Sequence, residues 1–256
     1  MKLIILAGGL GTRLVEETLV RPKPMVEIGG RPIIWHIMKI YSQYGFDEFI
    51  ICLGYKGFYI KEFFSNYMMH TSDTTFDMMN NRIDYHTHGA EPWRVTTIDT
   101  GEGTMTGGRL KRVLGHVADD EVFGFTYGDG VADIDIGAEL AFHRAHGKLA
   151  TVTAIQPPTR FGAMSLDDDR ILSFAEKPET DRGWINGGFF LLSPKVGDLI
   201  EGDATIWEQE PMNELVARGE MRAYRHSGFW HAMDTLCDKI FLEQEWAAGT
   251  PKWRVW

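Results

Sequence analysis

The sequence predicts an α/β protein built on a doubly wound, mostly parallel, Rossmann-like sheet, and three observations support this fold class. Apolar runs of strand length alternate with segments of helical period along the first half of the chain. The first apolar run is continuous, as expected for a strand buried on both faces. A glycine cluster follows it directly, at the position where parallel sheets bind ligands. The second half is less regular and predicts a smaller, β-rich elaboration.

The elements of the first half follow one another in strand–helix order. Residues 2–7 are the expected first strand, and residues 48–53 are the second. Between them Pro32 opens a helix, where its missing N–H costs nothing, and Gly45 ends it. This rhythm implies parallel strands joined by helices. The remaining elements expected in this half are helix 57–68, strand 94–98, helix 109–116, strand 122–127, helix 135–146 and strand 149–155.

No internal repeat or low-complexity linker divides the chain, so we expect a single domain spanning residues 1–256. Residues 69–92 interrupt the regular rhythm. They are polar, show no sustained period, and are interpreted as an inserted loop or hairpin. The elements expected in the second half are strand 171–175, strand 188–192, helix 210–217 and helix 235–247.

Charge, hydropathy and cysteine content exclude several classes of protein. The formal net charge of −10 argues against a nucleic-acid partner, which would need basic surface to neutralise phosphates. No apolar run approaches the length of a membrane span, and the run at residues 2–7 is short even for a signal peptide. Cys52 and Cys237 are interpreted as two buried free thiols, which suits a reducing cytosol. We therefore expect a cytoplasmic protein with no membrane partner.

The segment Gly8-Gly9-Leu10-Gly11-Thr12-Arg13 is a candidate phosphate-binding loop. Glycines let the backbone approach a phosphate closely, exposed N–H groups can cradle the anion, and Arg13 adds charge-assisted hydrogen bonds. A tight turn without a ligand would explain the glycines equally well. The dinucleotide fingerprint does not fit, because Leu14 occupies its third glycine position, and no Gly-Lys-Ser/Thr follows for a Walker loop.

Three further charged residues are candidates because of where they stand in the chain. Lys23 lies between two prolines that stiffen its loop, so it is either a phosphate clamp beside the glycine segment or a surface lysine. Asp129 follows the expected strand 122–127 and therefore lies at the carboxyl end of the sheet. Asp234 precedes the expected helix 235–247 and is either a helix cap or a carboxylate of the site.

Taken together, these motifs resemble the nucleoside-diphosphate-sugar pyrophosphorylase family of sugar nucleotidyltransferases, and the resemblance covers essentially the whole chain. The family landmarks stand in order as Leu6-Ala7-Gly8-Gly9-Leu10-Gly11-Thr12-Arg13-Leu14, Pro22-Lys23-Pro24, Tyr127-Gly128-Asp129, Glu176-Lys177-Pro178, Asn186-Gly187-Gly188 and Met233-Asp234. The finer wording is similar to the glucose-1-phosphate cytidylyltransferase branch, notably at Glu16-Glu17-Thr18, residues 23–30 and residues 105–112. Gly130 stands where many uridylyl- and thymidylyltransferases have asparagine.

The resemblance implies an enzyme whose substrates are CTP and glucose 1-phosphate, whose products are CDP-glucose and pyrophosphate, and whose cofactor is Mg²⁺. The sugar phosphate would attack the α-phosphorus, and because it is already ionised at neutral pH it would need no general base. The branch also implies a homo-oligomer that supplies deoxysugar synthesis for surface polysaccharide. The alternatives are the same reaction with UTP, dTTP or GTP, and a catalytically inactive regulatory domain of this fold.

The resemblance also implies a role for each landmark. The expected catalytic residues are Arg13, Lys23, Asp129, Lys177 and Asp234, and Asp129 and Asp234 would share one Mg²⁺. The expected nucleotide-binding residues are Leu6, Ala7, Gly8, Gly9, Gly11, Thr12, Arg13, Lys23, Thr104, Arg109 and Gly128. The expected sugar-phosphate-binding residues are Glu176, Lys177, Asn186 and Gly187. Nucleotide binding would fall to residues 1–135, and sugar binding with completion of the metal site to residues 136–256.

Arg109 is the hypothesised reader of the base. Its guanidinium could donate to O2 and N3 of cytosine while a backbone carbonyl accepts from the amino group. Uracil carries a proton on N3, so the same site would meet a donor with a donor and discriminate against it. The alternative is a solvated helix residue beside Lys111 and Arg112.

Overall fold

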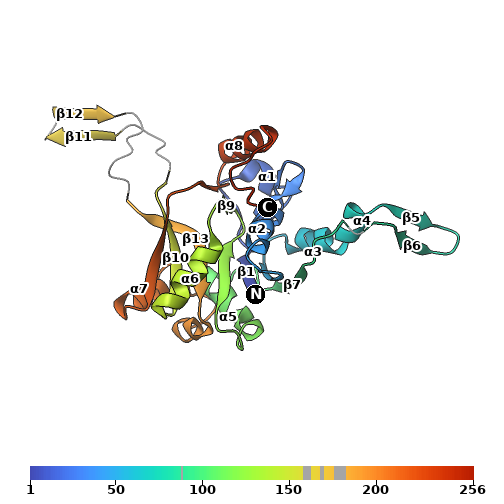
Figure 1. The fold of residues 1–256 in the computed structure, drawn as a ribbon, viewed down its shortest axis with the longest axis horizontal. Coiled ribbons are helices and arrows are strands. Elements are labelled where there is room, and N and C mark those ends of the chain that lie inside the picture. The colour runs from blue at the N-terminus through green and yellow to red at the C-terminus, as the bar shows by residue number, and fades with distance from the viewer. Residues whose placement is uncertain (88, 158–162, 168–169, 176–182) are drawn as a thin grey trace.

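A seven-stranded sheet lies at the centre of the part of the chain that the computed structural model describes, residues 1–87, 89–157, 163–167, 170–175 and 183–256 (Figure 1). Its strand order is β14-β10-β13-β8-β1-β4-β7. Adjacent strands are parallel except at β13, which runs antiparallel to both β10 and β8. The predicted mostly parallel α/β fold is therefore confirmed. The bounds are β1 (Lys2–Leu6), β4 (Glu48–Leu53), β7 (Arg94–Asp99), β8 (Phe123–Tyr127), β10 (Ala150–Ile155), β13 (Ile185–Leu192) and β14 (Met221–His226).

Edge strand β14 was not predicted from the sequence. Residues 221–226 contain two arginines and a histidine and carry no apolar run. As the last strand of the sheet, β14 pairs with β10 on its inner side and leaves Arg222, Ala223 and Arg225 exposed. An edge strand needs no apolar pattern on both faces, so the usual sequence signal for a strand was missing here.

Buried side chains fill both faces of the sheet, as expected for a doubly wound fold. Leu3 and Ile5 of β1 belong to one apolar cluster, whereas Ile4 and Leu6 belong to the other. This division follows from the two-residue period of a strand. The first cluster includes residues of α2 (Ile33–Ser42), α6 (Ile136–His146) and α8 (Leu236–Ala247), and the second includes residues of α5 (Thr106–Val113) and α7 (Glu210–Ala217).

Two helices differ from the sequence prediction. The helix expected at 57–68 is divided into α3 (Gly57–Ser65) and α4 (Tyr67–Thr71), with Asn66 between them. The helix expected at 109–116 begins three residues earlier, because its first turn contains Gly107 and Gly108. A Cβ atom on Gly108 would lie 2.5 Å from the carbonyl oxygen of Asp203, so close backbone packing requires the glycine. Glycines lower the helical signal of a sequence, which explains the late predicted start.

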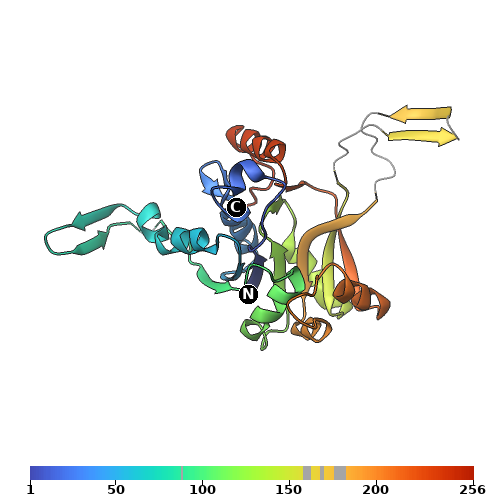
Figure 2. The ribbon, with the colours of Figure 1, turned by 180° about the vertical axis from the view of Figure 1, so that it is seen from behind.

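The polar insertion is a hairpin of strands β5 (Thr74–Asp77) and β6 (Arg82–Tyr85), reached through α3 and α4. Figures 1 and 2 show it projecting away from the body of the molecule. Its turn exposes Met78 and Met79, and Phe76 is also exposed. The expected loop or hairpin at 69–92 is therefore a hairpin whose apolar side chains face outward.

The two cysteines correct one expectation from the sequence. Both Cys52 and Cys237 are free thiols, but only Cys52 is buried. Burial was wrongly expected for Cys237, because α8 turns Asp238 and Leu242 inward and leaves Cys237 on its outer face. None of the described helices has the length and apolar character that a membrane span requires.

Short elements complete the described fold. They are α1 (Val15–Thr18), η1 (Lys23–Met25), β2 (Glu27–Ile28), β3 (Arg31–Pro32), η2 (Leu114–His116), β9 (Gly130–Ala132), β11 (Ala163–Asp167), β12 (Arg170–Ala175), η3 (Pro194–Leu199) and β15 (Trp230–Ala232).

Glu139 of α6 predicts a pH dependence of stability. The side chain is buried beneath the sheet and accepts a hydrogen bond of 2.7 Å from the hydroxyl of Thr153. Burial raises the pKa of Glu139 from 4.5 to about 8. The folded state therefore holds this carboxyl protonated, and the stability that it contributes is lost as pH rises from the unfolded pKa through the folded one.

We expect the Glu139→Gln variant to gain stability relative to wild type by about 1.4 kcal/mol per pH unit across that window. Glutamine stays neutral and can still accept from Thr153, and other titrating groups cancel in the comparison. Urea unfolding of both proteins at several pH values between 5 and 8 measures the difference. A difference in unfolding free energy that does not change with pH would contradict this assignment.

Candidate active site

The glycine loop lies beyond the carboxyl end of β1, where neighbouring backbone holds it in place. The N–H of Gly128 donates to the carbonyl of Leu6 at 3.0 Å, and the N–H of Ala7 donates to the carbonyl of Cys52 at 3.0 Å. Gly11 has a φ of +64° and lies so close to Thr18 that a Cβ would meet its methyl carbon at 2.7 Å. The loop is therefore shaped for glycine on its inner side.

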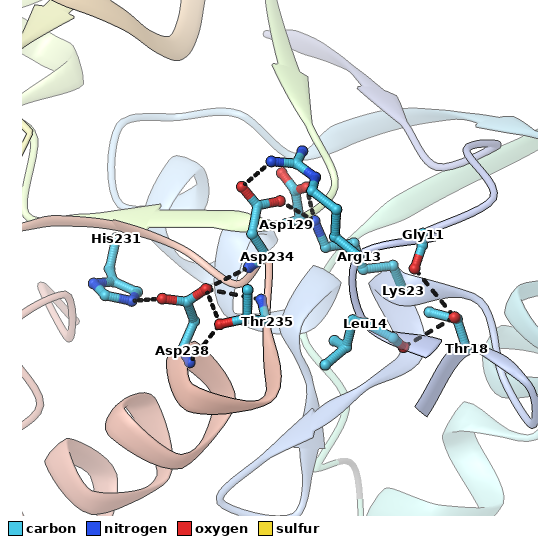
Figure 3. Close-up of polar contacts among 10 residues, drawn as sticks. All are labelled: Gly11, Arg13, Leu14, Thr18, Lys23, Asp129, His231, Asp234, Thr235 and Asp238. Carbon is cyan, nitrogen blue, oxygen red and sulfur yellow. Dashed lines mark hydrogen bonds and ion pairs between the residues drawn. The ribbon is translucent and has the colours of Figure 1, made fainter. Parts of the chain in front are cut away.

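The outer side of the glycine loop is open. A Cβ on Gly9 would have no heavy atom within 4 Å, and Thr12 and Arg13 are exposed beside it. The hydroxyl of Thr18 lies 3.1 Å from the carbonyl oxygen of Gly11 and 2.9 Å from that of Leu14, so it ties both ends of this turn together (Figure 3). A fixed loop with an open outer face suits approach by a phosphate group.

Arg109 lies beneath the glycine loop and is almost fully buried. Its Nη2 donates to the carbonyl oxygens of Gly8 and Glu102, each at 3.1 Å. Its Nη1 donates to the carbonyl oxygen of Leu53 at 2.9 Å and to the hydroxyl of Thr100 at 2.8 Å. Burial lowers the pKa of Arg109 from its usual value. The guanidinium therefore braces the loop against the ends of β4 and β7.

The solvated-helix alternative for Arg109 is wrong, because the side chain is buried and multiply hydrogen-bonded. Its contact with cytosine stays a prediction. The two terminal nitrogens carry four N–H groups, and each of them has an acceptor within the protein. Arg109 would reach the base through its terminal nitrogens only by exchanging one of these bonds. Thr104, the other residue expected near the base, is also buried.

Two acidic residues from distant parts of the chain converge on one lysine (Figure 3). The ammonium of Lys23 lies 2.6 Å from Oδ2 of Asp129 and 2.7 Å from Oδ1 of Asp234. The second oxygen of Asp234 accepts from Nη1 of Arg13 at 2.7 Å. Four of the expected catalytic residues thus form one connected cluster at the mouth of the glycine loop.

A short antiparallel ladder brings the two aspartates together. Strands β9 and β15 pair so that Gly130 lies opposite Ala232. Asp129 precedes β9 and Asp234 follows β15, so both leave the ladder at the same end. The N–H of Met233 also donates to the carbonyl of Asp129 at 2.9 Å. Sequence spacing alone gave no sign of this juxtaposition.

Asp238 supports the backbone of Asp234, and sequence reasoning missed it. Its Oδ2 accepts from the N–H groups of Asp234 at 3.1 Å and Thr235 at 2.8 Å. Its other oxygen lies 3.0 Å from Nε2 of His231. Thr235 caps α8 in a capping box with Asp238, so the alternative of Asp234 as the cap is wrong. The spacing Thr-x-x-Asp was the available signal.

Lys23 is held as a cation between the two carboxylates. Burial opposes its charged form, but the charges and hydrogen bonds of Asp129 and Asp234 outweigh burial and raise the pKa of Lys23. Carboxylate oxygens that already converge on one cation have the donor chemistry that a small divalent metal requires. No group of three or more His, Cys, Asp or Glu side chains suited to a metal was found among the described residues. Two protein carboxylates fit Mg²⁺, because it usually keeps waters and substrate phosphates in its shell.

A cavity of about 50 Å³ is lined by Asp129 and by two of the expected sugar-binding residues, Asn186 and Gly187. Trp230 also lines it and donates from Nε1 to the carbonyl oxygen of Gly187 at 2.7 Å. Trp230 was not predicted as a site residue, because an aromatic residue shortly before Met233-Asp234 gave no specific signal. The other two expected sugar-phosphate residues, Glu176 and Lys177, lie outside the described residues.

A larger cavity of about 360 Å³ lies elsewhere, between the α1–η1 region and helices α3 and α4. Arg21, Tyr59 and His70 are among its lining residues, and none of the predicted site residues is. Volume alone therefore does not mark the site. The convergence of Lys23 and two carboxylates beside the glycine loop is the stronger indication of chemistry.

A family model described as nucleotidyl transferase matches residues 2–231. The chain belongs to the nucleotidyl transferase family. This nucleotidyl transferase is 60% identical over 256 residues to glucose-1-phosphate cytidylyltransferase of Salmonella typhi, and the match covers 100% of both chains. The glucose-1-phosphate cytidylyltransferase of Salmonella typhimurium is also 60% identical, with 100% of both chains covered.

Solved structures support the fold of this nucleotidyl transferase. The crystal structure of HddC from Yersinia pseudotuberculosis matches with a TM-score of 0.68 at 22% identity, covering 96% of this chain and 99% of that chain. At this identity the likeness supports the architecture alone. The family membership that the glycine, lysine and aspartate motifs predicted is confirmed.

Proposed function

We propose that the protein transfers the cytidylyl group of CTP to glucose 1-phosphate, giving CDP-glucose and pyrophosphate. The 60% identity with a glucose-1-phosphate cytidylyltransferase over the whole of both chains carries this proposal. The geometry supports it, because Arg13, Lys23, Asp129 and Asp234 form one cluster beside an open glycine loop. A binding module would have no need of two carboxylates converging on a cation, so the inactive regulatory domain is disfavoured.

Asp129 and Asp234 would hold one Mg²⁺. When bound, the ion would neutralise negative charge on the phosphates of the triphosphate and the attacking sugar phosphate. The support from this structure is that both carboxylates already face a common cation, the ammonium of Lys23. Asp238, itself in contact with His231, accepts from the backbone N–H of Asp234, so the second carboxylate is presented from a fixed turn.

The other residues of the cluster position two anions for direct attack. The open face of the glycine loop would bind the phosphates of CTP through its N–H groups, with Arg13 and Lys23 supplying positive charge. Asn186 and Gly187 would line the acceptor pocket, and Glu176 and Lys177 would hold the sugar phosphate. Alignment and charge neutralisation then provide the rate enhancement, and no residue needs to remove a proton.

The same proposal assigns nucleotide binding and sugar binding to different parts of the chain. Residues 1–135 would bind the nucleotide, and residues 136–256 would bind the sugar and complete the metal site. A cytoplasmic location and a homo-oligomeric state stay predictions. Exposed apolar side chains on the β5–β6 hairpin support the second of these.

The decisive experiment is pyrophosphate release by the purified protein with glucose 1-phosphate and Mg²⁺, testing CTP, UTP, dTTP, ATP and GTP in parallel. We expect CTP to exceed each of the others by at least about a hundredfold in kcat/KM, because a buried polar site rejects a base that leaves its groups unpaired. Near-equal use of UTP and CTP would refute the base assignment. No release with any nucleotide or sugar 1-phosphate would favour the regulatory alternative.

A further inference from the structure

A chain of hydrogen bonds behind the acceptor cavity connects Asn186 to the start of helix α5. Nδ2 of Asn186 donates to the hydroxyl oxygen of Tyr127 at 3.3 Å. The hydroxyl of Tyr127 donates to Oε1 of Glu208. The other oxygen of Glu208 accepts from the hydroxyl of Thr106 at 2.6 Å. Glu208 is therefore the central member of a chain that runs from the cavity to the segment expected to bind the nucleotide.

The Asn186 amide is oriented at its oxygen by Gly188 and at its nitrogen by this chain. Its Oδ1 accepts from the N–H of Gly188 at 2.8 Å, and one N–H of Nδ2 is directed to Tyr127. An asparagine amide has two N–H donors, so one of them remains for a ligand in the cavity that Asn186 lines. If the two ends of the amide exchanged places, an oxygen would replace this donor.

Glu208 determines the direction of the hydrogen bonds. The hydroxyl of Tyr127 lies between the carboxylate of Glu208 and the amide of Asn186. A hydroxyl has one proton, and this one is committed to Glu208, which leaves an oxygen lone pair for Asn186. A carboxylate can only accept, so both hydroxyls that contact Glu208 must donate to it.

Glu208 is also fixed from its own side of the fold. The N–H of neighbouring Trp207 donates to the hydroxyl oxygen of Thr106 at 2.9 Å, and the N–H of Gly108 donates to the carbonyl of Thr205 at 3.2 Å. The segment before α7 is thereby joined to the first turn of α5. Glu208 does not line the cavity itself, so it would act through Tyr127 and Asn186.

We propose that Glu208 is a positioning residue for the acceptor sugar. Through Tyr127 it holds the Asn186 amide so that an N–H group meets a hydroxyl of the sugar 1-phosphate. Through Thr106 it connects the Asn186 amide to the start of α5, the segment expected to bind the nucleotide. This inference rests on the proposed function and assigns part of its sugar selectivity to a residue outside the pocket.

The test compares two sugar 1-phosphates that differ at one hydroxyl, glucose 1-phosphate and galactose 1-phosphate, at saturating CTP. In the Glu208→Gln variant an amide N–H can donate to Tyr127 and reverse the chain. We expect the ratio of kcat/KM for glucose 1-phosphate to kcat/KM for galactose 1-phosphate to fall about tenfold, because a hydrogen bond that discriminates between the two sugars is lost. The ratio does not depend on the fraction of active protein, so a merely structural role would leave it unchanged.

Tyr127→Phe provides the second variant, since it removes the link between Glu208 and Asn186. We expect it to lower the ratio similarly, and the double variant to show no further fall because both changes break one chain. Glu214→Gln is the matched control, because Glu214 is an exposed glutamate of α7 paired with Arg218 at 2.6 Å. It should leave the ratio unchanged.

Three results would overturn the inference. One is an unchanged ratio in both Glu208→Gln and Tyr127→Phe. Another is a fall in Tyr127→Phe alone, which would show that Glu208 does not act through the tyrosine. A wild-type protein that turns over neither sugar would refute the proposed function itself, and the inference with it.

Discussion

Replacing Asp129 by asparagine is expected to lower kcat by about a thousandfold, because charge stabilisation at the reacting phosphates is the largest contribution to such a reaction. The change removes one of the two carboxylates that converge on Lys23. Asparagine keeps the shape and can still accept a hydrogen bond from the lysine. Thermal unfolding should therefore stay close to that of wild type, while pyrophosphate release falls.

Direct metal binding separates this explanation from a loss of structure. Mn²⁺ serves as the probe, and its binding in the presence of CTP is measured by titration calorimetry or paramagnetic resonance. Asp129→Asn should weaken Mn²⁺ binding at least about tenfold. Asp84→Asn is the matched control, because Asp84 pairs with Arg82 at 2.8 Å in the distant hairpin. Unaltered Mn²⁺ affinity in Asp129→Asn would contradict the proposed metal site.

The Arg109→Lys variant should raise KM for CTP about a hundredfold, since several bonds beneath the glycine loop are lost together. The guanidinium of Arg109 spans four acceptors, including the carbonyls of Gly8 and Leu53. A lysine ammonium has three donors at a single point and cannot reach all of them. Acceptors left unpaired in a buried site should also lower the free energy of unfolding by about 2 kcal/mol.

Nucleotide selectivity then distinguishes the two roles of Arg109. If the residue also reads the base, the preference of Arg109→Lys for CTP over UTP should fall. If it only braces the loop, both KM values should rise in parallel and the preference should persist. Arg112→Lys is the matched control, because Arg112 lies on the same helix but pairs with Asp203 at the surface. An unchanged KM for CTP in Arg109→Lys would contradict the bracing role.

The parts of the fold that the sequence predicted well are those with local signals. The runs that became β1 and β4 are apolar after a charged first residue, and burial on both faces leaves few other interpretations. Where burial is one-sided or backbone packing is close, that signal fails. Strand β14 lies at the edge with exposed arginines, and the first turn of α5 needs glycines at Gly107 and Gly108 to approach a neighbouring segment.

The candidate site could be predicted in its parts but not in its assembly. The motifs identified Lys23, Asp129 and Asp234, yet only the β9–β15 ladder explains why the two aspartates face one cation. Supporting residues were harder to find, because their partners lie far away in sequence. Glu208 contacts Tyr127 and Thr106 through hydrogen bonds that no periodicity or spacing reveals.

Because β13 runs antiparallel to β10, residues 156–184 connect two neighbouring strand ends. Strand β10 ends at Ile155 and β13 begins opposite it at Ile185, so the chain between them leaves and re-enters the sheet at the same end of two adjacent strands. Its length and sequence can change without shifting the register of any neighbouring strand. Glu176 and Lys177, which are predicted to hold the sugar phosphate, belong to this stretch. If that prediction holds, selection for a new acceptor can act there while Asp129 and the glycine loop stay as they are. Among related enzymes, specificity for the sugar should therefore change more readily than the fold.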